Sequence, residues 1–452
     1  MIARRKGAPQ REGPMQTIWA EHALIGGVWE RDVYLYIAGG HIRRIVTDCD
    51  PADNRVALLV PAPANVHHHA ALRALAEGGG AVARPEAQRR LLDRMTPDDL
   101  EAVAALAQME MLETGYGACV EFHRLHNAPD GTPYSRPAEM AERVVAAAGA
   151  TGIGLALVPV HTRYGGADGR APGPHEARFA TNREQFARLV EGARAACADL
   201  ARDAVVGVSP HSLREVPADH LGEVTAQAGG GPVHMHLAAS AEEVEEVRAA
   251  LGARPGDWAL ENLPLDGRWC LIHCAHLDRD ETRALGATGA VTGLCPVARA
   301  GEGGHSLDLA GWLRAGGGLG VGSGGNLRPL LPAELAPLLP AFAAGGDGAG
   351  RRLLAAAARG GARAAGRGAG RIEPGAWADL LALDTTHPDL AGLSPDAGLD
   401  RFVRSAGTAA GRGMVRHVWA AGRHLVRDGR HVWRERILSR YEAAASGLRA
   451  AL

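Results

Sequence analysis

Histidines follow several apolar, β-rich runs of this chain, where they could bind a metal ion. Three consecutive histidines at 67–69 follow one run, and His236 ends another as the second member of a His-x-His pair. The two-residue period of a strand places His67 and His69 on the same side and turns His68 away. Two imidazoles on one side of a strand can converge on a single ion.

Neutral imidazole is a common nitrogen ligand of zinc, and three protein ligands with one open position can activate a bound water. His67, His69 and His236 would supply three ligands, and His273 ends a further apolar run. The pattern predicts a zinc-dependent hydrolytic site. A second interpretation stays open, in which these histidines only form hydrogen bonds at the strand ends of a barrel with another function.

Eight apolar runs alternate with helical segments, which is typical of parallel βα units. Eight such strands close a barrel, and the active site of a barrel forms where its strands end. Helix starts are marked by Thr96-Pro97, with Gly115 at the end of that helix, and by Ser240 with Glu243 as a capping box. We therefore predict an α/β fold, a (β/α)8 TIM-type barrel. The eight runs are Leu58–Pro61 leading to Val66, Ala118–Phe122, Leu155–Val160, Ala204–Val208, Val233–Leu237, Cys270–His273, Ala290–Leu294 and Leu319–Gly322.

Short β-like patterns at both chain ends predict one small β domain, formed by residues 16–60 and 372–440 around a barrel at 61–371. Residues 1–15 are expected to be a disordered tail, and 441–452 a C-terminal helix or tail. The stretch Arg359–Arg371 is rich in Gly, Ala and Arg. We interpret it as a flexible connector, with RNA binding as the alternative.

Composition favours a small-molecule partner. The chain has 452 residues with 49 Lys and Arg against 51 Asp and Glu, so no strong field attracts nucleic acid or an anionic membrane. No stretch of eighteen uninterrupted apolar residues predicts a membrane span. The six cysteines are scattered and form no CxxC pair, which indicates a reducing, cytoplasmic setting.

Five motifs within residues 16–440 carry a family resemblance. They are Asn65-Val66-His67-His68-His69-Ala70, Glu121-Phe122-His123, Ser209-Pro210-His211-Ser212-Leu213-Arg214, Arg268-Trp269-Cys270-Leu271-Ile272-His273 and Gly293-Leu294-Cys295-Pro296. With them the chain resembles the amidohydrolase superfamily and, within it, the formimidoylglutamate deiminases of histidine degradation. The resemblance implies hydrolysis of the formimino C–N bond of N-formimino-glutamate, which yields N-formylglutamate and ammonia, by a homodimer.

The resemblance also implies roles for individual residues. One zinc would be held by His67, His69 and His236, and His273 would polarise or orient the water. The substrate, a small anionic amidine or amide, would be bound by His211, Arg214 and Arg124, the last standing where the family has a tyrosine. Arginine suits this task because its planar fork matches a carboxylate.

Two carboxylates of the family are replaced in this chain. Gly324 stands where the family has an aspartate that binds the metal and takes a proton, and Ala239 stands where a glutamate passes a proton to the leaving nitrogen. A positioned acid or base contributes roughly 10²–10⁴-fold to a rate. Glu121 is a possible substitute base. Two hypotheses therefore stay open, a slow deiminase and an inactive paralogue that binds ligand, metal or an active partner.

Overall fold

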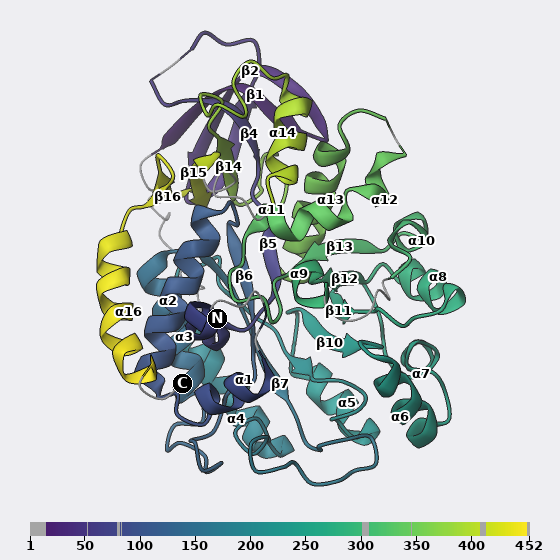
Figure 1. Ribbon diagram of the computed structural model, residues 1–452. Coiled ribbons are helices and arrows are strands. Elements are labelled where there is room, and N and C mark those ends of the chain that lie inside the picture. Colours follow the sequence, from purple (N-terminus) through teal and green to yellow (C-terminus); the bar gives the residue numbers. More distant parts are fainter. Residues whose placement is uncertain are drawn as a thin grey trace, which may run out of the picture.

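The computed structural model describes residues 15–449, apart from 52, 79–81, 83, 301–306, 345 and 407–412. Figure 1 shows a twisted sheet, drawn at the top, above a ring of strands surrounded by helices. Of the disordered tail expected at 1–15, only Met15 is among the described residues, and 450–452 are outside them. In the described part of the chain, no helix is both long enough and apolar enough to cross a membrane.

The lower body is a ring of parallel strands in the order β10-β11-β12-β13-β5-β6-β7-β8, with the short β9 paired to β7. A parallel bridge between Val208 and Val233 joins the two ends of this order and closes the ring. Because β8 and β9 are two pieces of one run, the ring has eight strand positions, and the predicted (β/α)8 barrel is confirmed. The strands are β5 (Ala64–His68), β6 (Ala118–His123), β7 (Gly154–His161), β8 (Val205–Val206), β9 (Ser209–Pro210), β10 (Val233–Leu237), β11 (Trp269–His273), β12 (Val291–Leu294) and β13 (Gly318–Val321).

The first predicted barrel run is wrong in its boundaries. Residues 58–61 belong to β4 (Arg55–Pro61), which lies in the upper sheet, and the barrel strand begins only at Ala64. Pro61 and Pro63 have no N–H to donate to a ladder, so the apolar run is broken into two strands of different sheets.

Helices surround the ring (Figure 1). Helix α2 begins as predicted, because the Thr96 side chain accepts the N–H of Asp99 and the Asp99 carboxylate accepts that of Thr96. The helical segments are η1 (Ala70–Gly78), α1 (Pro85–Leu92), α2 (Pro97–Glu113), α3 (Glu139–Thr151), α4 (Arg183–Ala198), α5 (Ala218–Ala226), α6 (Ala241–Leu251), α7 (Pro255–Asn262), α8 (Arg279–Ala287), α9 (Pro296–Arg299), α10 (Leu309–Arg314), α11 (Leu331–Leu335), η2 (Ala336–Leu338), α12 (Pro340–Ala343), α13 (Ala349–Ala364), α14 (Pro395–Arg404) and α16 (Arg434–Arg449).

The capping box predicted at Ser240 and Glu243 forms only by half. Ser240 Oγ accepts the N–H of Glu243 at 3.1 Å. The Glu243 carboxylate instead accepts the N–H groups of Ala238 and Ala239, at 3.1 and 2.8 Å. Ala238 has φ +49°, and this left-handed turn carries the two N–H groups within reach of Glu243.

Both chain ends build the upper sheet, in the order β17-β16-β15-β14-β4-β1-β2-β3. Its own apolar core includes Ile18, Leu35, Leu59 and Leu380. The sheet thus forms a second body beside the barrel, as expected from the β-like patterns at the two ends. Its strands, apart from β4, are β1 (Gln16–Ile25), β2 (Val28–Ala38), β3 (His41–Val46), β14 (Leu380–Leu383), β15 (Val415–Ala420), β16 (Arg423–Arg427) and β17 (Arg430–His431).

The flexible connector predicted at Arg359–Arg371 is wrong. Helix α13 continues to Ala364, and a Cβ added at Gly360 would lie 1.9 Å from the carbonyl oxygen of Leu319 in the barrel. The small residues thus let a helix pack directly on the barrel strand. Beyond the helix, the buried Arg367 forms ion pairs of 2.8 Å with Asp203 and 2.9 Å with Asp379.

Candidate metal and substrate site

Three histidines from different strands converge at the mouth of the barrel. His67 comes from β5, His236 from β10 and His273 from the end of β11, and their ligand nitrogens all lie within 4.8 Å of one another. The Nε2 atoms of His67 and His236 are 3.3 Å apart. Within the described residues, this group of converging ligand atoms contains no carboxylate.

The spacing fits a shared ion. Two nitrogens that each lie about 2.0–2.1 Å from a tetrahedral zinc are about 3.3 Å from one another. Burial is the main cause that holds the pKa of His67 and of His236 well below the usual value, and the neighbouring imidazoles add to it. Burial and, to a smaller extent, the charge of Arg299 lower the pKa of His273 to about 3. The three rings are therefore neutral at pH 7, as metal ligands must be.

The backbone at this site is unusual, and so are the Nδ1 atoms of its three histidines. His273 and Cys274 have φ values of +72° and +54°, a region that side chains rarely adopt and that is concentrated at functional sites. In the described structure, the buried Nδ1 atoms of His67, His236 and His273 have no hydrogen-bond partner. Metal-binding histidines usually donate this second N–H to a fixed partner, which strengthens metal binding.

His69 lies one residue beyond β5 and outside the group of three. Its ring is 4.7 Å from that of His67, between ring centroids. Burial and, to a smaller extent, the charge of Arg124 lower the pKa of His69 to about 4. A hydrogen bond to the backbone of Phe122 opposes this shift. The structure groups His273, and not His69, with His67 and His236. The ligand role of His69 and the water-orienting role of His273 stay predictions.

The Phe122 ring packs against the imidazoles of three of these histidines. Its centroid lies 4.6 Å from that of His67, 4.8 Å from His236 and 5.6 Å from His69. Sequence reasoning did not assign this residue a role. Alternation along β6 could have found it, because Phe122 has to face the barrel interior if Val120 does.

Glu121 is turned the other way along β6. Both of its carboxylate oxygens accept the N–H of Ala70, at 3.0 and 3.2 Å, where η1 begins. Burial raises the pKa of Glu121 to about 8, although the bond from Ala70 opposes the shift. This position suits a carboxylate that caps η1, on the strand face opposite Phe122. A substitute base at Glu121 stays a prediction.

Small residues occupy the two positions at which the resemblance implied carboxylates, and the space at one of them is tight. Gly324 has φ +52°, and a Cβ added there would lie 3.2 Å from Cys295 Sγ. Its N–H donates to the carbonyl oxygen of His67 at 2.8 Å, so the residue lies beside the metal group. Ala239 lies three residues after His236, and its N–H is bound by Glu243.

The expected substrate-binding residues already have acidic partners. Arg214 forms a two-pronged bond with Glu246, from Nε at 2.6 Å and from the terminal nitrogen at 3.0 Å. Arg124 lies 3.1 Å from Glu215, and Nδ1 of His211 lies 3.1 Å from the same carboxylate oxygen. Sequence reasoning missed Glu215. Its one signal is its place directly after the Ser-to-Arg motif.

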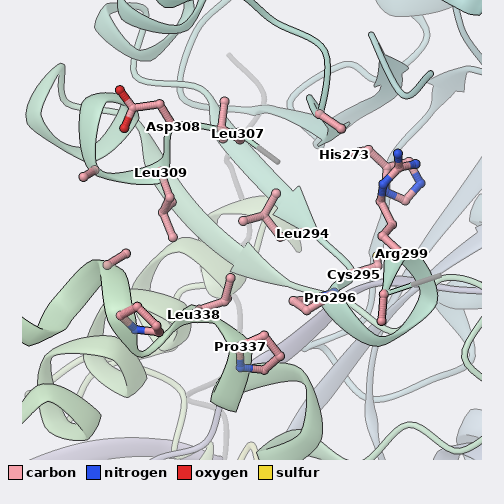
Figure 2. Close-up of a pocket in the computed structure, with 15 residues that line it drawn as sticks. His273, Leu294, Cys295, Pro296, Arg299, Leu307, Asp308, Leu309, Pro337 and Leu338 are labelled. Atoms are coloured by element: carbon pink, nitrogen blue, oxygen red, sulfur yellow. The ribbon is translucent and has the colours of Figure 1, made fainter. Parts of the chain in front are cut away.

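A cavity of about 550 Å³ opens beside His273. Figure 2 shows His273 and Arg299 together at one end, Asp308 at the other and leucine side chains between them. The lining is mostly apolar, which is typical of small-molecule sites.

The sequence of the chain from residue 58 to residue 424 matches the model of the amidohydrolase family. The chain belongs to this family. Formimidoylglutamate deiminase of Pseudomonas aeruginosa is 36% identical over 445 residues, 93% of this chain and 97% of that protein. The crystal structure of an amidohydrolase from Brucella melitensis has 36% identity and a TM-score of 0.88, and the match covers 96% of this chain and 99% of that one.

A more distant protein shares the fold. The structure of an adenosine deaminase from Xanthomonas campestris has a TM-score of 0.78 at 20% identity, over 96% of this chain and 98% of that chain. The family membership and the group formed by His67, His236 and His273 together indicate a metal-dependent site for a small substrate.

Proposed function

We propose that the protein is a zinc-dependent hydrolase of a C–N bond in a small anionic amidine or amide. The observation that carries this proposal is the convergence of three neutral histidines, one buried and two half-buried, two of which have Nε2 atoms 3.3 Å apart. N-formimino-glutamate is the first candidate substrate, because a formimidoylglutamate deiminase is 36% identical along nearly the whole chain.

The described residues can divide the work among themselves. His67 and His236 would hold the zinc with His69 or His273 as the third ligand, and the fourth histidine would orient the attacking water. A zinc held by these residues would supply a water with a pKa lowered toward about 7 and a positive charge beside the reacting carbon. Arg124, His211 and Arg214 are the candidates for binding the acid group of the substrate.

Proton transfer is the step of the reaction for which this chain has the fewest suitable side chains. Gly324 and Ala239 cannot move a proton, and a positioned acid or base contributes roughly 10²–10⁴-fold each. We therefore expect turnover far below that of an intact site. The same observation favours a second candidate function, an inactive amidohydrolase that binds ligand, metal or an active partner.

The proposal also covers the compartment and the oligomeric state of the protein. We propose a cytoplasmic homodimer, supported by the six free cysteines, five of which are buried, and by the resemblance to deiminases of histidine degradation.

The test is ammonia release from N-formimino-glutamate by the zinc-loaded chain, run beside a Gly324→Asp/Ala239→Glu variant. The proposal predicts slow, zinc-dependent release by the native chain and release at least about 100-fold faster by the variant. Release by the variant alone would favour the inactive amidohydrolase. A Gly324→Ala/Ala239→Ser variant is the matched control, because it adds side chains at the same two positions without a carboxylate.

A further inference from the structure

A cluster of polar and charged side chains adjoins the metal group at the mouth of the barrel. Arg124 directly follows β6, and His211 and Glu215 follow β9. The ring centroid of His211 lies 4.8 Å from that of His236, and the N–H of His236 donates to the carbonyl oxygen of His211 at 2.9 Å. Because the ends of barrel strands form one mouth, a ligand held at the metal group also lies beside this cluster.

Glu215 occupies the hydrogen-bond donors of the cluster. Its Oε2 atom lies 3.1 Å from a terminal nitrogen of Arg124 and 3.1 Å from Nδ1 of His211. The hydroxyl of Thr162 donates to the same oxygen at 3.4 Å. Within the described residues, the second oxygen, Oε1, accepts no hydrogen bond, and the side chain is 18% exposed. An ionised carboxylate only accepts hydrogen bonds, so Oε1 remains open to a donor from a ligand.

The surroundings of Glu215 fix its position and favour its charged form. Its carbonyl oxygen accepts the N–H groups of Arg163 and Tyr164, each at 2.9 Å, in the loop after β7. Its own N–H donates to Ser212 Oγ at 3.3 Å. Burial raises the pKa of Glu215, but the charge of Arg124 opposes this shift and favours the ionised carboxylate. The acid is therefore a fixed part of the cluster.

The second arginine of the cluster is occupied in the same way. Nε and a terminal nitrogen of Arg214 bind the two oxygens of Glu246, at 2.6 and 3.0 Å, and Glu242 lies 3.5 Å from the guanidinium. With Arg124 and Glu215, these contacts set two arginines against three glutamates. A carboxylate of a ligand would have to displace one of these acids, whereas a neutral carboxamide brings N–H donors that a carboxylate lacks.

The position of His211 decides which end of a substrate meets Glu215. His211 contacts both His236, in the metal group, and Glu215. A substrate whose formimino carbon lies at the metal therefore reaches Glu215 with an end several bonds away. In an N-formimino amino acid with a long side chain, this is the end of the side chain.

We propose that Glu215 is a specificity-determining residue, which makes the site select an N-formimino amino acid with a side-chain carboxamide, as in glutamine, over one with a side-chain carboxylate. This inference rests on the proposed function and changes its substrate class from glutamate-like to glutamine-like. The amide N–H donates to Oε1 of Glu215, where a carboxylate would be repelled. In the reaction, water adds to the formimino carbon and the bond from that carbon to the terminal nitrogen breaks. The oxygen of water remains in the N-formyl product, and the terminal nitrogen leaves as ammonia.

The test compares two products of the same shape, N-formyl-glutamine and N-formyl-glutamate, as ligands in calorimetry on the zinc-loaded full chain. A hydrogen bond to a charged group corresponds to about a tenfold or larger change in affinity, so we expect the amide to bind at least about tenfold tighter. Glu215→Gln should reverse this preference, because it removes the acid and supplies N–H donors at the same place. The control is Glu176→Gln, which removes the charge of an exposed glutamate near Glu215 and should change the preference by less than about twofold.

Each result has a definite meaning. Tighter or equal binding of N-formyl-glutamate, binding of neither product, or the same preference in native chain and Glu215→Gln would overturn the inference. The comparison on the native chain decides by itself if Glu215→Gln does not fold. If the amide is preferred but no N-formimino amino acid releases ammonia, the role of Glu215 stands and the proposed function fails. If N-formimino-glutamate turns over but the amide is not preferred, the proposed function stands and the inference fails.

Discussion

Arg367 connects the barrel to the upper sheet, and its removal should be strongly destabilising. Its guanidinium is buried between Asp203, which precedes β8, and Asp379, which precedes β14. Asp203 also binds Arg423 at 2.8 Å, and Asp379 accepts the N–H of Ala421 at 2.6 Å. Arg367→Met would leave two buried carboxylates with fewer partners. Breaking a buried ion pair in this way costs about 3–5 kcal/mol.

This loss is large enough to measure by urea unfolding. With a slope of about 2–3 kcal/mol/M, it would lower the midpoint by about 1–2.5 M. The control is Arg371→Met, which removes an exposed arginine paired with an exposed Glu373 and should change stability by less than about 1 kcal/mol. A triple variant with Asp203→Asn and Asp379→Asn added should recover part of the loss, because no buried charge remains unpaired.

The pH dependence follows from Asp203. Burial alone would raise its pKa, but Arg423 and Arg367 outweigh burial and hold the pKa below the usual value. The folded state thus favours the ionised carboxylate, and this stabilisation is present above pH about 4 and lost as the pH falls further. The gap between native protein and Arg367→Met should therefore persist from pH 7 to about 4 and narrow as the pH falls below 4. A gap below about 1 kcal/mol at pH 7, or one that widens in acid, would refute the reasoning.

Three further predictions concern the metal group. His236→Ala should weaken zinc binding at least about 100-fold in a chelator competition, whereas His175→Ala, at an exposed histidine paired with Asp93, should not; equal losses would contradict the assignment. Because burial lowers the pKa of His67 and His236, their rings stay neutral below pH 6.5. Zinc affinity should therefore change little between pH 8 and 6. A tenfold fall in affinity over this range would contradict the neutral state of the two rings. Glu121→Gln should leave ammonia release within about twofold, because this carboxylate faces Ala70; a loss of about 100-fold would make Glu121 the base.

The barrel could be predicted from the sequence because strand and helix periods are local signals. The histidines at 67–69, 236 and 273 follow apolar runs, and parallel strands bring such ends to one mouth. The break at Pro61 and Pro63 was also local and could have been recognised. The interpretation of residues 359–371 failed for another reason, since glycine can loosen a chain or let a helix approach a strand closely, and only packing distinguishes the two.

Pairings between distant side chains could not be predicted. Nothing in the order of residues shows that Glu246 binds Arg214 or that Glu215 lies between Arg124 and His211. These contacts arise when separate βα units are placed side by side. The same holds for the cavity, whose walls come from segments before and after residues 301–306. Contacts that depend on the packing of separate units are thus the least visible in the sequence.

The central claim is metal-dependent hydrolysis at the histidine group, and a zinc titration of activity tests it most directly. The chain would be stripped of metal and supplied with zinc in steps, while ammonia release from N-formimino-glutamate is followed. We expect release that rises in proportion to zinc up to one equivalent per chain and is absent from His236→Ala. Equal release by the stripped chain, or no release from N-formimino-glutamate by the native chain and by Gly324→Asp/Ala239→Glu at any zinc concentration, would contradict metal-dependent hydrolysis.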